Sequence, residues 1–227
     1  MRICLLEKVR ENRYNAINAY SFFLQKRENI MKKLRIILAS GSSARSHILS
    51  QCGIPHTVMA SNVKEIMDVS KGPRYNARIN ARRKAQAIAE KVKDGIVIGA
   101  DSLVLLGRRL IGKPKSKQDA QKLLTAFSGK TISLYTGLCL KDVRRNKSKE
   151  AVTVTTIKVK RIAKDEFNKY LEKLEPYDKA GGFSIEGVGS FIFDDIKGSY
   201  FNVLGLPTIT LKELFKKLGI DLLDYIY

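Results

Sequence analysis

The sequence lacks tryptophan altogether, and its 227 residues include only 3 cysteines, 2 histidines and 5 prolines. The cysteines (Cys4, Cys52 and Cys139) are odd in number, scattered and without a CxxC pair. This pattern argues against a disulfide framework and against a zinc site. No apolar run approaches the ~20 residues that a membrane-spanning helix requires. These absences predict a cytoplasmic protein with reduced thiols and no membrane association.

Acidic residues are also few, because 22 aspartates and glutamates stand against 42 lysines and arginines, and the formal charge is +20. A charge of this size attracts anions of any kind, including nucleotides, nucleic acids and acidic lipids, and does not choose among them. The apolar content of 44% is sufficient for a full hydrophobic core in one domain or in two closely packed lobes.

The N-terminal stretch differs in character from the rest of the chain, and we predict that residues 1–33 form an extension, helical or disordered, outside the core. Met31 to Lys33, followed by an apolar run at 34–38, is a more natural start for a folded domain. A mitochondrial-type presequence is the alternative interpretation of the extension. The predicted domain spans residues 34–220, and residues 221–227 are predicted to form a C-terminal tail.

Apolar periodicity alternates between the strand and helix patterns along this domain. Strands are predicted at 34–38, 57–59, 95–98, 132–140 and 151–159, and helices at 43–52, 76–92, 116–127, 167–174 and from the cap residue Thr208 to 218. The polar run 67–76 is predicted to be a loop, 142–150 a charged hairpin, and 190–204 a hairpin that turns at Lys197–Gly198. Alternating strands and helices followed by hairpins predict an α/β fold with a mixed sheet.

Asp101 lies between two apolar runs, 95–98 and 103–106. A buried carboxylate must be paired, hydrated or bound to metal, because leaving it alone costs on the order of several kcal/mol. We therefore predict that Asp101 stands at a strand end as a catalytic acid or base.

Two basic elements that contain glycine, Ser40–Arg45 and Gly112–Pro114, are predicted to lie near that strand end and to hold a polyphosphate. The first element joins a strand to a helix, where backbone N–H groups and the helix dipole favour an anion. The guanidinium of Arg45 adds donors that match a phosphate. The alternatives are a small-residue turn with a surface arginine and, at Lys113, an ordinary turn lysine.

A third cluster, Asp178–Gly187, contains Lys179, which is a candidate phosphate ligand, and Glu186, which is a candidate acceptor for a nucleobase or else a solvated loop acid. Two nucleotide signatures fail: Gly129–Thr131 lacks the first glycine of a P-loop, and Gly187–Gly189 lacks the third glycine of a dinucleotide fingerprint.

Together these motifs resemble one family, the Maf (septum-formation-inhibitor-like) nucleotide pyrophosphatases. The matching segments follow one another in the expected order: Leu38–Ser42 with Arg45, Ile98–Ser102, Gly112–Pro114, Ser128–Lys130, Tyr135–Gly137, Asp178–Gly181 and Val203–Pro207. The resemblance covers roughly residues 34–220 and leaves the N-terminal extension uncovered.

The resemblance implies an α/β fold similar to the inosine triphosphate pyrophosphatases: an elongated mixed β-sheet with flanking helices, and two lobes around a cleft. Such proteins are often homodimers. The implied reaction is hydrolysis of a nucleoside triphosphate, including non-standard or modified nucleotides, between its α- and β-phosphates, assisted by a divalent cation such as magnesium or manganese.

The resemblance also assigns roles by position. Asp101 is implied as the proton acceptor that activates water, and Glu65 with Asp101 as the metal ligands. Substrate-binding residues are implied at Ser40, Ser42, Arg45, Lys84, Lys113 and Lys179, and specificity positions at Ala44, Ser102 and Glu186.

Several positions depart from the family pattern. Ser43 and Ala44 replace a proline and an arginine, and Ser102 replaces a threonine. Asn62 and Lys64 stand where many members have acids, which leaves Glu65 as the acid of that segment. Glu186 replaces the glutamine of the thymidine and uridine triphosphate subgroup. A glutamate at that point is typical of the 7-methylguanosine triphosphate subgroup, but its other specificity residues differ from Ala44 and Ser102, so the preferred base stays open.

The competing hypothesis is a nucleic-acid-binding module without catalysis. Its candidate contacts are the basic runs Arg82–Lys84, Lys113–Lys117 and Arg144–Lys149. These runs have no interleaved aromatic residues for base stacking. We therefore expect the basic surface to bind nucleic acid only weakly and without specificity.

Overall fold

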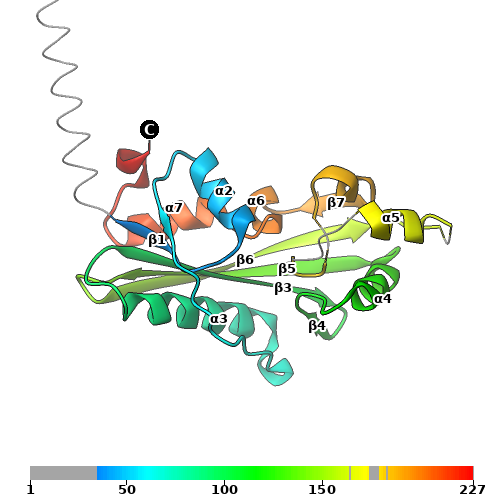
Figure 1. Ribbon diagram of the computed structural model, residues 1–227, viewed down its shortest axis with the longest axis horizontal. Helices are drawn as coiled ribbons and strands as arrows, with labels where there is room; N and C mark the ends of the chain where they lie inside the picture. The colour runs from blue at the N-terminus through cyan, green and yellow to red at the C-terminus, as the bar shows by residue number, and fades with distance from the viewer. Residues whose placement is uncertain (1–34, 164, 174–178, 183, 227) are drawn as a thin grey trace, which may run out of the picture.

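The computed structural model describes residues 35–163, 165–173, 179–182 and 184–226. The predicted extension and the first residue of the strand predicted at 34–38 lie outside these ranges. Between Arg35 and Ile226 the chain forms a mixed sheet with helices on both faces, which confirms the α/β class (Figure 1).

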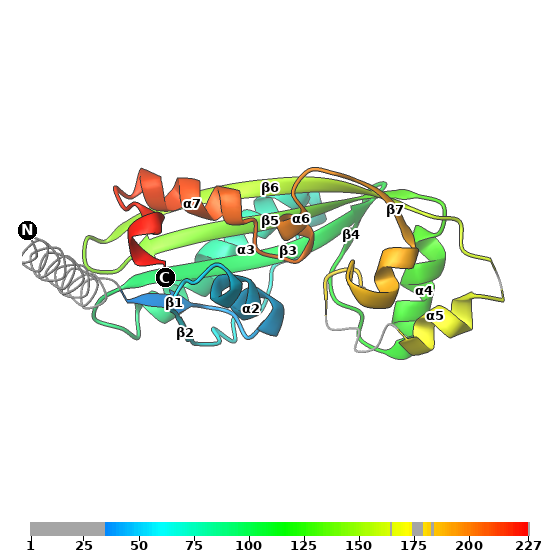
Figure 2. The same cartoon turned by 90° about the horizontal axis from the view of Figure 1, so that it is seen from above.

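Within the described residues the sheet contains seven strands in the order β2-β1-β3-β5-β6-β7, with β4 paired to β3 off this path. Their bounds are β1 Ile36–Leu38, β2 Thr57–Val58, β3 Ile96–Leu106, β4 Arg109–Ile111, β5 Thr131–Asp142, β6 Lys147–Val159 and β7 Phe193–Lys197. Strands β1, β2 and β3 are parallel to one another, and the remaining pairs are antiparallel. The long strands β3, β5 and β6 run the length of the molecule and make it elongated, as predicted (Figure 2).

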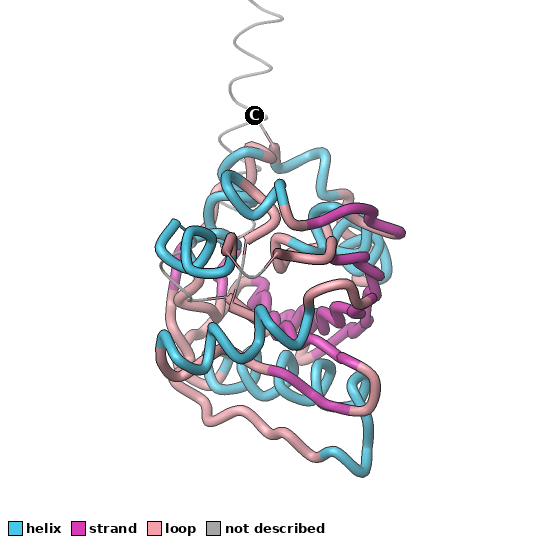
Figure 3. Tube along the Cα trace, turned by 90° about the vertical axis from the view of Figure 1, so that its right-hand side faces the viewer, coloured by secondary structure: helices cyan, strands magenta, loops and turns pink. Residues whose placement is uncertain are grey.

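Helices cover both faces of this sheet (Figure 3). They are α2 Ser43–Gln51, α3 Gly72–Ala89, α4 Lys117–Phe127, α5 Phe167–Lys173, α6 Tyr200–Val203 and α7 Thr208–Lys217, with short 3-10 turns at η1 Val69–Lys71, η2 Gly187–Phe191 and η3 Leu222–Tyr225. Helix α3 lies on one face, and α2, α6 and α7 lie on the other (Figure 1). Helices α4 and α5 sit together at the far end of the long strands (Figure 2).

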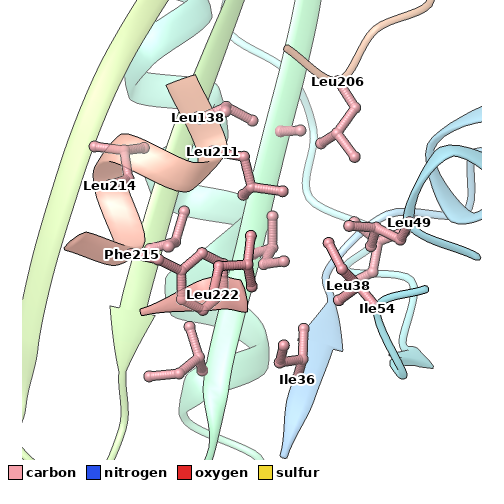
Figure 4. Close-up of a cluster of buried hydrophobic side chains, with 14 of the residues drawn as sticks. Ile36, Leu38, Leu49, Ile54, Leu138, Leu206, Leu211, Leu214, Phe215 and Leu222 are labelled. Carbon is pink, nitrogen blue, oxygen red and sulfur yellow. The ribbon is translucent and has the colours of Figure 1, made fainter. Parts of the chain in front are cut away.

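Side-chain alternation along the strands divides the core into three parts. In β1, Ile36 and Leu38 pack with α2 and α7, whereas Ile37 packs with α3, because successive strand residues point to opposite faces. The first cluster gathers Leu49 of α2 and Phe215 of α7 over the strands (Figure 4). A separate cluster fills the far end around α4 and α5. The first two clusters thus lie on opposite faces at the β1 end of the sheet, and the third lies at the other end, in keeping with the two predicted lobes.

Two segments differ from the sequence-based prediction. The polar run predicted as a loop at 67–76 already contains η1 and the first residues of α3, because Asp68 accepts a hydrogen bond from the Ser70 backbone N–H and Pro73 stands in the first helical turn. The second arm of the hairpin predicted at 190–204 is instead the helix α6. Ser199 caps this helix by accepting a hydrogen bond from Asn202 N. The first arm contains β7, which pairs with β6.

The hairpin predicted at 142–150 is shorter than expected. Strand β5 continues to Asp142 and β6 starts at Lys147, which leaves residues 143–146 as the turn. None of the helices in the described ranges is both long and apolar enough to cross a membrane.

Strand β3 is continuous through Asp101, so the prediction that this residue stands at a strand end is wrong. One edge of β3 pairs with β5 from Ile96 to Leu105. The other edge pairs with β1 up to Ile98 and with β4 from Val104 onward. Among the described strands, none pairs with residues 99–103 on that second edge. Asp101 therefore lies at the middle of a gap between two strands.

Candidate active site

A cavity of about 390 Å³ opens beside this gap. Its size lies within the range of small-molecule binding sites. Ten of the residues selected from the sequence line it: Ser40, Ser42, Ala44, Arg45, Glu65, Lys84, Asp101, Ser102, Lys113 and Lys179. They come from the β1–α2 turn and the start of α2, the segment before η1, α3, β3, the segment after β4 and the chain before η2. The fold thus brings together most of the predicted site.

Asp101 is nearly inaccessible, with 3% of its surface exposed, and both of its carboxylate oxygens accept hydrogen bonds. Lys84 Nζ donates to Oδ1 over 2.6 Å, and Asn80 Nδ2 donates to Oδ2 over 3.0 Å. The same Lys84 ammonium contacts Glu65 Oε1, also at 2.6 Å. The cavity floor is therefore a carboxylate–lysine–carboxylate cluster.

Burial and charge shift the pKa values of the two acids of this cluster in opposite directions. Burial raises the pKa of Asp101, and the negative charge of Glu65 adds to that effect while Lys84 opposes it. Partial burial acts in the same direction on Glu65, but the hydrogen bond and charge of Lys84 outweigh it and lower the pKa of Glu65. A raised pKa makes Asp101 the better proton acceptor of the pair.

Arg45 is buried and forms hydrogen bonds along the unpaired edge of β3 at residues 99–103. Its Nη1 donates to the Ala100 carbonyl over 3.1 Å and to Ser40 Oγ over 3.0 Å. Its Nη2 donates to Ser102 Oγ over 3.0 Å, and its Nε donates to the Gly205 carbonyl over 2.9 Å. The Ala100 carbonyl faces the gap, so Arg45 supplies the hydrogen bond that a neighbouring strand would have donated there. Burial lowers the pKa of Arg45, against the opposing charges of Asp101 and Glu65.

The N-terminal turn of α2 forms the part of the cavity that is suited to an anion such as phosphate. Ser42, the N-cap, makes no side-chain cap hydrogen bond, and Ser42, Ser43 and Ala44 line the cavity. The first backbone N–H groups of a helix attract anions, together with the helix dipole. Lys113 and Lys179 line the same cavity. Cationic groups therefore border the site on several sides.

Glu186 is not among the residues that line this cavity. Its Oε1 accepts a hydrogen bond from the Tyr200 hydroxyl over 3.4 Å. Burial raises the pKa of Tyr200, and the neighbouring charge of Glu186 adds to the increase.

Asn80 is the contact of Asp101 that sequence reasoning missed. On α3 the polar Asn76 and Asn80 are fully buried, whereas the apolar Ile79 beside them is only half-buried. One signal was available: Asn76, Asn80 and Lys84 recur at a spacing of four, which places them on one stripe of a helix.

Two of the residues that line the cavity, Glu65 and Asp101, are carboxylates that could serve as ligands of a divalent cation. In the part of the chain that the structure describes, no group of three or more histidine, cysteine, aspartate or glutamate residues could hold a metal ion. Magnesium commonly binds through one or two carboxylates, with phosphate and water oxygens as its other ligands. Glu65 and Asp101 supply such a pair at the floor of the cavity.

Comparison with known proteins agrees with the geometry. The model of the family described as "Maf-like protein" matches residues 35–218. A dTTP/UTP pyrophosphatase of Caldicellulosiruptor saccharolyticus is 34% identical over 197 residues, which cover 85% of this chain and 98% of the relative. The dTTP/UTP pyrophosphatase of Aquifex aeolicus is 38% identical over 191 residues, with coverage of 82% and 97%. One from Bacillus anthracis is 36% identical over 187 residues, with the same two coverages.

Proposed function

The chain belongs to the Maf-like protein family, and from this membership we propose that it is a nucleoside triphosphate pyrophosphatase, a hydrolase that acts on acid anhydrides. Its reaction converts a nucleoside triphosphate and water into a monophosphate and pyrophosphate. The observation that carries the proposal is the buried Asp101 carboxylate, with its raised pKa, on the floor of a cavity bordered by cationic groups.

In the proposed mechanism Asp101 accepts a proton from a water molecule as the water oxygen bonds to the α-phosphorus. The bond between the α-phosphorus and the oxygen that bridges the α- and β-phosphates breaks, and this oxygen leaves with the pyrophosphate. Lys84 holds Oδ1 of Asp101, which directs the carboxylate toward the cavity. Its ammonium also offsets the negative charge that gathers around the reacting phosphate.

The triphosphate is held by the other cationic groups. Ser40, Ser42 and the N-terminal turn of α2 donate hydrogen bonds to phosphate oxygens, and Lys113 and Lys179 neutralise their charge. Arg45 acts mainly by keeping Ser40 and Ser102 in place, because four of its hydrogen bonds end on protein acceptors. A divalent cation, magnesium or manganese, would be held by Glu65 and Asp101 and would supply charge stabilisation for the phosphates.

The substrate is proposed to be a pyrimidine nucleoside triphosphate, including non-standard or modified forms, because the relatives named above are dTTP/UTP pyrophosphatases. Ala44, Ser102 and Glu186 are the proposed specificity positions. Of these, Ala44 and Ser102 line the cavity. We further propose that the protein acts in the cytoplasm and forms a homodimer, which sedimentation analysis would measure.

Pyrophosphate release from a panel of nucleotides tests the proposed function. With magnesium or manganese present, we expect pyrophosphate release from dTTP and UTP at a typical enzyme turnover of about 1 s⁻¹ or more. The diphosphates dTDP and UDP serve as blanks, because they carry only one phosphate beyond the α-phosphate and cannot yield pyrophosphate. A parallel gel-shift series with single-stranded DNA is expected to show only weak binding that disappears with added salt. No release from any nucleotide, combined with tight and salt-resistant DNA binding, would favour the nucleic-acid-binding hypothesis instead.

Deleting residues 1–30 is expected to leave both the thermal midpoint and the turnover unchanged. The family match begins at residue 35, and the cavity is lined by residues from Ala39 onward. The measurement compares the full chain with the truncated chain by calorimetry and by pyrophosphate release. A truncated protein that melts far lower, or loses activity, would show that the proposed domain of residues 34–220 is not self-sufficient.

A further inference from the structure

Two asparagines on the buried face of α3 bind the segment that precedes η1. Asn76 and Asn80 are 0% and 1% exposed. The Asn76 side chain accepts from Asp68 N over 2.7 Å and donates to the Asp68 carbonyl over 2.7 Å. Asn80 repeats this arrangement with Ile66, accepting from its N–H over 2.8 Å and donating to its carbonyl over 3.0 Å. Each side-chain amide thus forms with residue 66 or 68 the pair of hydrogen bonds that the backbone of a neighbouring strand would form.

The two asparagines differ in what they do with the rest of their hydrogen-bonding capacity. Asn76 Nδ2 also donates to the Gly72 carbonyl of its own helix. Asn80 Nδ2 instead donates to Asp101 Oδ2 over 3.0 Å. The orientation of the Asn80 amide is determined by Ile66, because a flipped amide would direct its NH₂ group at the Ile66 N–H and its oxygen at the Asp101 carboxylate.

We infer that Asn80 is a positioning residue for the proposed reaction: it holds Oδ2 of Asp101 and ties that carboxylate to the segment carrying Glu65. The inference rests on the proposed function, in which Asp101 is the proton acceptor. Lys84 contacts only Oδ1 and is shared with Glu65, so it does not by itself determine the rotation of the carboxylate. Asn80 supplies the second, rigid contact, because its own amide is held at both ends by Ile66.

The consequence is that three parts of the site are held as one unit. Asp101 belongs to β3, Asn80 to α3, and Ile66 directly follows Glu65 in the chain. Loss of the Asn80 amide would free the carboxylate to rotate and would also loosen the neighbouring segment. Loss of the Asn76 amide would also loosen the neighbouring segment, but Asn76 makes no hydrogen bond with Asp101. Asn76 is therefore a matched control.

The test compares Asn80→Leu with Asn76→Leu, since leucine keeps the branched shape and removes every polar atom of the side chain. Both variants lose two hydrogen bonds to the segment before η1, so we expect similar decreases in thermal midpoint. For Asn80→Leu we expect kcat for dTTP to fall by about 10- to 100-fold with KM changed less than about threefold, because a misplaced reacting group mainly slows the chemical step. For Asn76→Leu we expect kcat within about threefold of the wild type.

A second pair of variants separates positioning from general loosening. In an Asp101→Asn background, measured by single turnover with enzyme in excess over radiolabelled dTTP, adding Asn80→Leu should cost less than about threefold, because the group that Asn80 positions is already gone. A full additional tenfold loss would overturn the inference and assign the effect to the segment bearing Glu65. Equal kcat for Asn80→Leu and the wild type would also overturn it.

Two further outcomes are distinguished by the same series. If Asn80→Leu does not fold, Asn80→Ser replaces it, because its hydroxyl is one bond shorter than the amide, and the same kcat decrease is expected. If the wild-type protein itself releases no pyrophosphate from any nucleotide, the proposed function fails rather than the role of Asn80.

Discussion

Asp101→Asn is expected to lower magnesium-dependent turnover by about 10²–10⁴-fold, the usual contribution of a general base. Asparagine keeps the shape of the side chain and removes both the proton acceptor and a negative charge that attracts a cation. The measurement is pyrophosphate release by the purified variant beside the wild type. Turnover within about threefold of the wild type would contradict the mechanism, because that difference is less than ~1 kcal/mol of activation free energy.

The same substitution should not destabilise the fold at neutral pH. The pKa of Asp101 is raised in the folded state, so this carboxyl favours folding below its unfolded pKa, and the contribution is lost as the pH rises through the folded pKa. Asparagine removes that loss and leaves the pair of Glu65 with Lys84 in place, but its NH₂ group would face a donor, either Lys84 or Asn80. We therefore expect the metal-free variant to fold at pH 7 with a thermal midpoint close to that of the wild type. A variant that fails to fold would instead assign Asp101 a structural role.

Gly137→Ala is expected to destabilise the protein by about 3 kcal/mol or more, and to abolish activity with it. A methyl group at Gly137 of β5 would lie 2.2 Å from the Ala77 carbonyl oxygen and 2.8 Å from Arg78 N, both in the backbone of α3. Because no side-chain rotation can relieve a contact with backbone, the helix must move away from the sheet. Helix α3 carries Asn80 and Lys84, so its displacement would also disrupt the contacts of Asp101.

Chemical denaturation by urea measures this effect, with Gly112→Ala as the control. A methyl group at Gly112 would meet only the end of the Met67 side chain, at 4.0 Å, and the control should change the free energy of unfolding by about 1 kcal/mol or less. Gly99→Ala should resemble Gly137→Ala, because its methyl group would lie 2.1 Å from the Ala81 carbonyl oxygen. Wild-type stability in Gly137→Ala would mean that α3 packs less closely than the structure shows.

Local patterns were sufficient to predict much of the architecture. The apolar alternation of β5 and the helical spacing of Leu123, Leu124 and Phe127 reflect which side chains face a core, and those side chains are buried in the structure. The alternation of β6 was less informative, because Val152 and Val154 are only half-buried, whereas Ile157 and Val159, in the opposite phase, are buried. The segment 199–204 was predicted incorrectly because its short apolar run suits a strand as well as a helix. Tertiary contacts decide in favour of the helix: Asn202 is buried and donates to the Leu134 carbonyl and to Thr155 Oγ1.

The sequence alone was sufficient to predict the fold class, the family and ten of the residues that line the cavity, because these follow from periodicity and from motifs that are contiguous in the chain. Only the tertiary structure decided how Asp101 is held. Its environment depends on β1 ending at Leu38 and β4 beginning opposite Val104, and on Arg45, Asn80 and Lys84 arriving from two helices. These side-chain contacts join residues 17 to 55 positions apart, and no local pattern encodes which polar side chain will lie beside a buried carboxylate across such separations.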